Sequence, residues 1–351
     1  MKCSAIVPDF KKLSNKIINV SRVINLLINI AKFCKSDNKA IKISSIILAK
    51  VVVTGILIIW IINSLDFESF TNIINTINWP IITWAIIVSF VDMSISALRW
   101  KVLMRPFKPH FSYLYLLYLT FVAHCYNMVV PGNIAGDVVR AFKTSMATVF
   151  LDRLIGMLGL VVIVLFGIIF SYPMLSELDL MKYIIVVMLI LSLLSICIFS
   201  RRIMRKFKWI GNLLGPFYEK IREAVLSIQL YRNYCREIIE AFCVTLSSHI
   251  LLITTVYLIN MAIGSNATYL HCLLFVPVIV LISSLPVTIA GLGLREAGYI
   301  LLFTQVGVTK EHALGMSLIY FLLFFGWAIV GAILSVIPIE KILFLKEVKS
   351  E

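Results

Sequence analysis

Long apolar runs separated by short polar segments dominate the chain. Six of these runs are long enough to span a membrane, and they occupy residues 44–62, 79–98, 154–170, 183–199, 242–262 and 313–337. An α-helix of roughly 20 apolar residues crosses the hydrocarbon core of a bilayer. The pattern therefore predicts an all-α integral membrane protein with about six full transmembrane helices.

Two further apolar regions are interrupted by proline and glycine. The first comprises 111–130 and 141–150, and the second comprises 271–285 and 299–306. The charged loops around them require each region to start and finish on one side of the membrane, because basic loops favour the cytoplasm. We therefore predict two re-entrant helical hairpins that enter from opposite faces. Eight to ten ordinary helices with Pro-Gly kinks are the alternative.

The two interruptions are similar in sequence. Residues 131–140 are PGNIAGDVVR and residues 286–295 are PVTIAGLGLR, with proline, Ile-Ala-Gly and arginine at the same spacing. Related motifs that enter from opposite faces indicate an inverted repeat, and in transporters such broken helices meet near the midplane at the substrate site. A chance likeness between apolar segments is the alternative.

Composition and charge exclude several classes of protein. The chain is 60% hydrophobic and 14% charged, so we expect no soluble catalytic domain. The net charge is +14, but the basic residues gather in 1–42, in 201–236 and after 340, beside apolar runs. This placement follows the positive-inside rule and argues against a nucleic-acid partner. It predicts a multi-pass protein of the cytoplasmic membrane with both termini in the cytoplasm.

These features divide the chain into three regions. Residues 1–42 have apolar positions at three- and four-residue steps among basic residues, which predicts an amphipathic cytoplasmic segment on the membrane surface and no cleaved signal. Residues 43–340 form the polytopic membrane domain, and 341–351 form a cytoplasmic tail. The seven cysteines contain no CxxC pair and the five histidines are scattered, so we predict no metal and no cofactor.

Six charged residues fall at or near membrane depth: Asp137, Arg140, Asp152, Arg153, Arg295 and Glu296. Each costs about 2.5–3.5 kcal/mol at mid-span, so each needs protein, water or a ligand around it. Asp137 and Arg140 share a helix face. The adjacent pairs, Arg295 with Glu296 and Asp152 with Arg153, must find partners elsewhere. Pairing of Asp137 with Arg295, or of Glu296 with Arg140, would form either a closed ion-pair network or a ligand site.

The glycines of both motifs favour the ligand site. They expose backbone N–H groups at predicted helix N-termini, where anions bind, and arginine adds a planar fork for phosphate oxygens. We therefore predict that a phosphate-bearing lipid headgroup binds at Gly132, Asn133, Gly136, Asp137, Arg140, Gly291, Gly293, Arg295 and Glu296. Pro131, Asp152, Arg153 and Pro286 would support this site.

Lys50 and Asp92 lie at similar depths in the first two predicted spans, six or seven residues from the inner end of each. An ion pair between the two spans explains both charges. The rival interpretation is that Asp92 is a proton-coupling carboxylate.

Four motifs in order give the chain a resemblance to the flippase-like family, which comprises the membrane region of lysylphosphatidylglycerol synthases and its stand-alone relatives. The motifs are ALRW at 97–100, the segment at 131–140, LDRL at 151–154 and the segment at 285–296. The resemblance covers about 45 to 340. It implies a multispan module that moves aminoacylated phospholipid, or other polar or isoprenoid lipids, between leaflets. Bifunctional members continue into a soluble aminoacyl-transferase domain, and this chain stops at Glu351, so we expect no lysylphosphatidylglycerol synthesis.

We therefore expect a flippase-like translocator of a phosphate-bearing lipid and not an enzyme. Its expected partners are a phospholipid or another polar lipid, the membrane, and a separate lipid-synthesising enzyme. Two alternatives stay open. A membrane-embedded transferase or hydrolase would use Asp137 or Glu296 as a general base, and a scaffold for an envelope-lipid synthase would not transport at all.

Overall fold

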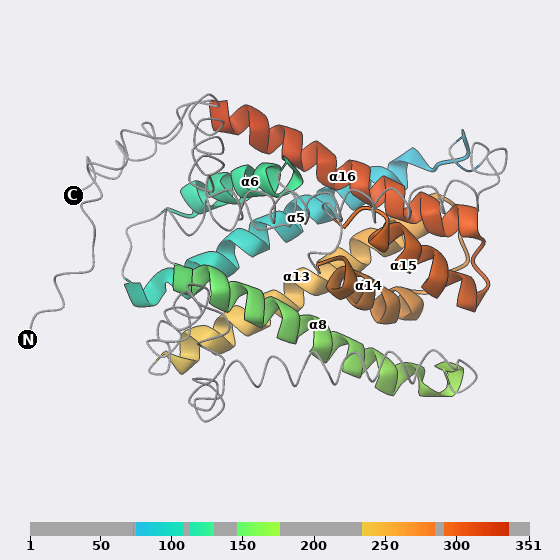
Figure 1. The fold of residues 1–351 in the computed structure, drawn as a ribbon, viewed down its shortest axis with the longest axis horizontal. Helices are drawn as coiled ribbons and strands as arrows, with labels where there is room; N and C mark the ends of the chain where they lie inside the picture. Colours follow the sequence, from blue (N-terminus) through green and yellow to red (C-terminus); the bar gives the residue numbers. More distant parts are fainter. Residues whose placement is uncertain are drawn as a thin grey trace, which may run out of the picture.

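A computed structural model describes residues 73, 75–107, 112–129, 146–175, 234–284 and 291–336 of the chain (Figure 1). These residues form helices and no strand, which confirms the predicted all-α class. The α-helices are α5 (Trp79–Met104), α6 (Tyr113–Val129), α8 (Met146–Leu175), α13 (Cys235–Ala262), α14 (Tyr269–Ser283), α15 (Leu294–Phe303) and α16 (Lys310–Val336). Short 3-10 turns follow α5 at Arg105–Phe107 and α15 at Thr304–Val306.

Four of these helices are long and apolar enough to cross a membrane. They are Trp79–Met104, Leu151–Ile169 within α8, Cys235–Ala262 and Lys310–Val336. Large apolar side chains on their outer faces are exposed, including Trp84 at 62%, Phe166 at 58% and Leu322 at 62%. Such faces suit lipid tails and not water. The predicted spans at 44–62 and 183–199 lie outside the described residues, so the predicted count of six stays a prediction.

Helix α13 packs along α5 in the opposite direction. The backbone N–H of Asn78, before α5, donates to the carbonyl of Ala262 at the end of α13, at 2.9 Å. Midway, Ser248 of α13 contacts Asp92 of α5, and at the other end Arg105 contacts Glu240. This pairing agrees with the opposite directions predicted from the charged loops. Helix α8 packs against α13 as well (Figure 1).

Helices α6 and α16 cross very closely at Gly331. A Cβ atom added at Gly331 would lie 2.1 Å from the backbone oxygen of Phe121 in α6 and 3.2 Å from Cβ of Cys125. Small residues at crossings let membrane helices approach until their backbones touch. Glycine is therefore required here by space, and the crossing fixes α6 against α16.

Helices α14 and α15 form an antiparallel hairpin. Gly291 approaches the carbonyl of Ser283 at the end of α14, Gly298 approaches Ile279, and the rings of Phe303 and Phe275 lie 5.3 Å apart. The helices have 15 and 10 residues, so their lengths are about 22 and 15 Å and both fall short of a bilayer core. The arms therefore have the dimensions of the predicted re-entrant hairpin. The copy at 131–140 lies outside the described residues, so the inverted repeat stays a prediction.

One predicted boundary is wrong. The sequence pattern separated an arm at 141–150 from a span at 154–170, with Asp152 and Arg153 between them, whereas α8 runs without a break from Met146 to Leu175. The helix continues because Asp152 is paired with a base of a neighbouring helix, as described below, so its charge does not force the chain out of the membrane.

Candidate functional site

A polar cavity of about 200 Å³ lies between α5, α6, α13 and α16. Asp92 and Ser248, which line it, lie midway along α5 and α13, so the cavity is at mid-depth of two membrane-length helices. We call it the polar cavity. Its lining consists of Asp92, Met93, Ser96, Arg99, Thr120, His124, Asn127, Ser248, His249, Leu252 and Phe324.

Asp92 is held in the polar cavity by a neutral partner. The hydroxyl of Ser248 donates to its carboxylate across the α5–α13 contact. The predicted pair of Asp92 with Lys50 stays a prediction, because Lys50 lies outside the described residues. Ser248 was not predicted as a site residue. A lone serine in an apolar run carries no signal of its own, and only the packing of two helices places it opposite the acid.

Two histidines bind backbone carbonyls at the edge of the polar cavity. Nε2 of His249 lies 3.0 Å from the carbonyl oxygen of Gly156 in α8, and Nε2 of His124 lies 3.3 Å from that of Phe324 in α16. A carbonyl oxygen can only accept, so Nε2 carries the hydrogen in both rings. Gly159 allows α8 to come this close, because a Cβ there would lie 3.0 Å from the His249 ring.

Arg99 and Asp152 form a two-point ion pair between α5 and α8. Nε of Arg99 lies 2.6 Å from Oδ1 of Asp152, and Nη2 donates to Oδ2 at 3.1 Å. Their side chains are only 11% and 10% exposed. Asp152 was expected to find a partner away from Arg153, and it does. Arg153 is exposed because neighbouring positions of a helix point in different directions.

Arg99 lines the polar cavity as well as binding Asp152, and it was not among the predicted site residues. A signal for it was present in the sequence. Arg99 follows directly on the apolar run 79–98, within the ALRW segment, and a base at that position needs an acid on another helix.

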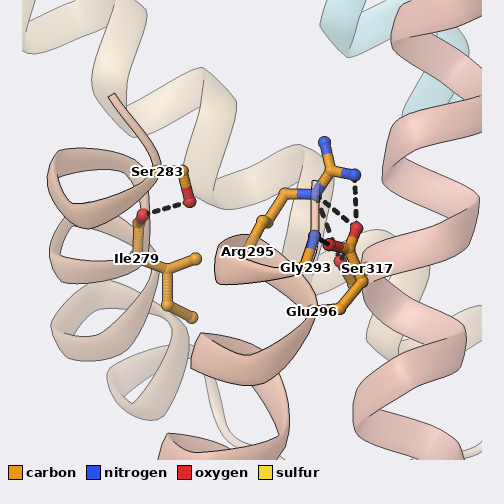
Figure 2. A network of polar contacts seen from close by, with 6 residues as sticks. All are labelled: Ile279, Ser283, Gly293, Arg295, Glu296 and Ser317. Atoms are coloured by element: carbon orange, nitrogen blue, oxygen red, sulfur yellow. Dashed lines mark hydrogen bonds and ion pairs between the residues drawn. The ribbon is translucent and has the colours of Figure 1, made fainter. Parts of the chain in front are cut away.

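A second polar centre lies at the start of α15, where the sequence predicted a helix N-terminus (Figure 2). The turn before it needs glycine, because Gly291 has a φ of 74° and Gly293 has a φ of 84°. The N–H of Gly293 donates to Oε2 of Glu296 at 2.6 Å. The anion at this N-terminus is therefore the protein's own carboxylate, which forms a cap on the helix.

Arg295 pairs with its neighbour in sequence. Its Nη2 lies 2.5 Å and its Nε 3.1 Å from Oε1 of Glu296 (Figure 2). The prediction that these adjacent residues must find partners elsewhere is wrong. In the first turn of α15, Glu296 folds back over the N-terminus to cap it, and the long arginine side chain reaches the same carboxylate.

Two residues of α16 complete this group. The hydroxyl of Ser317 accepts from Nε of Arg295 at 3.2 Å and donates to Oε1 of Glu296 at 3.3 Å. The guanidinium carbon of Arg295 lies 4.9 Å from the centre of the Phe321 ring. We call Gly293, Arg295, Glu296, Ser317 and Phe321 the hairpin cluster. It ties the hairpin to α16. The choice between a closed ion-pair network of both motifs and a ligand site depends on Asp137 and Arg140, and it stays open.

Several predicted site residues lie outside the described residues: Pro131, Gly132, Asn133, Gly136, Asp137, Arg140 and Pro286. The proposed pairing of Asp137 with Arg295, or of Arg140 with Glu296, therefore stays a prediction. Within the described ranges, no three His, Cys, Asp or Glu side chains come together in a group that could hold a metal ion.

Comparison with known protein families gives a match over most of the chain. Residues 47–332 match the family described as the lysylphosphatidylglycerol synthase TM region. That range covers most of the chain and includes the polar cavity and the hairpin cluster. A search of curated proteins found no match.

Proposed function

We propose that the chain, which belongs to the lysylphosphatidylglycerol synthase TM region family, moves a phosphate-bearing lipid between the two leaflets of the cytoplasmic membrane. Membership of the family links it to lipid synthesis or lipid movement. The observation that supports movement is the polar cavity at mid-depth between helices whose outer faces are apolar.

The chemistry of the polar cavity suits a headgroup in transit. A phospholipid moves between leaflets slowly by itself because its charged headgroup must leave water, whereas its tails can stay in the hydrocarbon. The Ser96 hydroxyl and the Arg99 guanidinium line the polar cavity and offer donors for phosphate oxygens. The exposed apolar faces of α5 and α16 leave the tails in lipid.

We assign the hairpin cluster a positioning role. Glu296 already accepts the Gly293 N–H and the Arg295 fork, so a phosphate could bind there only by displacing a carboxylate that the cluster holds with short contacts. The prediction that Arg140 and Gly132 bind phosphate rests on the first motif and is retained in the proposal.

We further propose that the end of the bundle near Arg105 and Arg236 faces the cytoplasm. The support is that the end of α5 and the start of α13 bring these basic residues together around Glu240. Cys235 is exposed at this end. In sealed vesicles of known orientation, an impermeant maleimide should label Cys235 from the cytoplasmic side only, with Cys235→Ser as the control, and labelling from the outer side would contradict this topology.

The decisive experiment follows lipid exchange in proteoliposomes. Vesicles of phosphatidylethanolamine and phosphatidylglycerol carry a trace of acyl-labelled phosphatidylglycerol, and dithionite reports how much label reaches the outer leaflet. We expect exchange well above that of protein-free vesicles. A new lipid species on a chromatogram would support the enzyme alternative, and neither exchange nor a new lipid would support the scaffold alternative.

A matched pair of variants tests the route through the polar cavity. Ser96→Leu fills the cavity with an apolar side chain and should slow exchange at least about tenfold, equivalent to about 1.4 kcal/mol of barrier. Ser247→Leu makes the same change at an exposed position of α13, next to Ser248, and should exchange like the wild type. Equal rates for both variants would rule out this route.

A further inference from the structure

The contacts of Asp92 differ from those of the two buried acids among the described residues. Asp152 and Glu296 are buried, and they face an arginine at 2.6 and 2.5 Å, whereas Asp92 is half-buried. Asp92 faces the Ser248 hydroxyl, and no ion pair within these ranges includes it. A hydroxyl stabilises a carboxylate without cancelling its charge.

The base nearest to Asp92 on its own helix is already engaged. Arg99 is about two helical turns further along α5, and both its Nε and its Nη2 face Asp152 in α8. Arg99 also acts on Asp92 through space, but its own contacts are to Asp152, so among the described acids of the bundle interior Asp92 is the one without a direct arginine contact. Tyr320 of α16 lies within electrostatic range of Asp92, and its phenol carries no charge in its ordinary state.

Two further titratable groups line the same cavity. His124 comes from α6 and His249 from α13, and each has its Nε2 hydrogen directed at a backbone carbonyl. A fixed Nε2 hydrogen leaves Nδ1 as the position that can receive a proton. The polar cavity thus contains one carboxylate and two imidazoles.

We propose that Asp92 binds a proton which moves together with the phosphate-bearing headgroup, so that a pH gradient drives the lipid movement proposed above. This inference rests on the proposed function. A phosphate that enters the polar cavity beside an ionised Asp92 meets a like charge at short range in a low-dielectric site. A proton on Asp92 removes that repulsion, so headgroup and proton enter together and leave together.

The direction of coupling follows from this charge argument. An anionic lipid and a proton that move together carry no net charge, so a pH gradient alone drives them. The lipid therefore accumulates in the leaflet that faces the alkaline side. With one proton per lipid, a gradient of one pH unit shifts the leaflet ratio about tenfold at steady state.

The experiment uses the full chain in the vesicles described above, with an imposed gradient of about one pH unit and acyl-labelled phosphatidylglycerol as the probe. We expect about tenfold accumulation toward the alkaline side and uptake of protons by an enclosed pH dye as the label moves. Accumulation toward the acidic side would overturn the proposal. Exchange without accumulation would overturn the coupling and leave the proposed function standing, whereas no exchange at all would overturn the proposed function.

Variants assign the effect to Asp92. Asp92→Asn should abolish accumulation, and Asp92→Glu, which keeps a carboxyl group, should retain it. Glu240→Gln makes the same acid-to-amide change at the end of the bundle, outside the polar cavity, and should accumulate lipid like the wild type. Lys50→Gln tests the ion-pair interpretation, because loss of accumulation in that variant would show that a charge pair is required and would overturn the proposal.

Discussion

Replacement of Gly331 by alanine should separate α6 from α16. The added Cβ would lie 2.1 Å from the carbonyl oxygen of Phe121 and 2.7 Å from its carbon, whereas ordinary contacts begin at 3.4 Å. The difference of 3.4 − 2.1 = 1.3 Å cannot be relieved by a side chain, since the atoms in the way belong to the backbone of α6. The two helices must therefore move apart along their whole crossing.

The energetic consequence can be estimated against a control in the same helix. A Cβ added at Gly326 would meet nothing within 4 Å, so Gly326→Ala should gain the helix propensity of alanine, about 1 kcal/mol in stability. At Gly331 the same gain is opposed by overpacking of about 3 kcal/mol. The expected gap between the two variants is therefore about 3 kcal/mol.

Thermal unfolding in detergent micelles measures this gap. At roughly 2 °C per kcal/mol, Gly331→Ala should melt about 6 °C below Gly326→Ala. The same variant should alter lipid exchange, because Phe121 lies next to Thr120 in the wall of the polar cavity. Equal melting temperatures would show that α6 and α16 do not touch at Gly331 and would refute this packing.

Three further predictions concern the buried charges. Asp152→Asn leaves Arg99 without its acid and should cost about 3 kcal/mol in thermal unfolding. Glu240→Gln breaks an exposed pair and should cost far less, so equal losses in the two variants would contradict the buried pairing. Glu296→Gln removes the charge that caps α15, so hydrogen exchange over 291–303 should speed up, and unchanged protection would count against the cap. Arg295→Lys keeps the positive charge but loses the two-nitrogen contact of the guanidinium with Glu296, so lipid exchange should fall. Arg236→Lys makes the same change at an exposed site and should exchange lipid like the wild type. Normal exchange in both variants would show that the guanidinium contact has no role in exchange.

The apolar pattern was enough to locate the long helices. The runs 79–98, 242–262 and 313–337 correspond to α5, α13 and α16. An apolar run can be recognised from neighbouring residues alone, and the thickness of the bilayer sets how long a spanning run must be. The ends differ by a few residues because polar turns such as 235–241 extend a helix beyond its apolar part.

The polar cavity could not be read from the same pattern. Its hydroxyls and imidazoles are single polar residues in separate apolar runs, and only the packing of four helices brings Ser96, Thr120 and Ser248 to one place. The pairing of Arg295 with Glu296 was missed for the opposite reason. Adjacent residues point in different directions within a helix, but in the first turn a glutamate can fold back to the N-terminus.

Helix α16 connects the two polar centres. Ser317 and Phe321 belong to the hairpin cluster, and Phe324 lines the polar cavity. These three residues are spaced by four and three positions, so they lie on one face of α16. A displacement of α16 that widened the cavity at Phe324 would also pull Ser317 away from Arg295 and Glu296. In the proposed lipid movement, the hairpin cluster would therefore resist a displacement of α16 and hold the hairpin in place. The contact between Arg295 and Glu296 offsets the cost of two charges at this place, because each charge meets its opposite at short range.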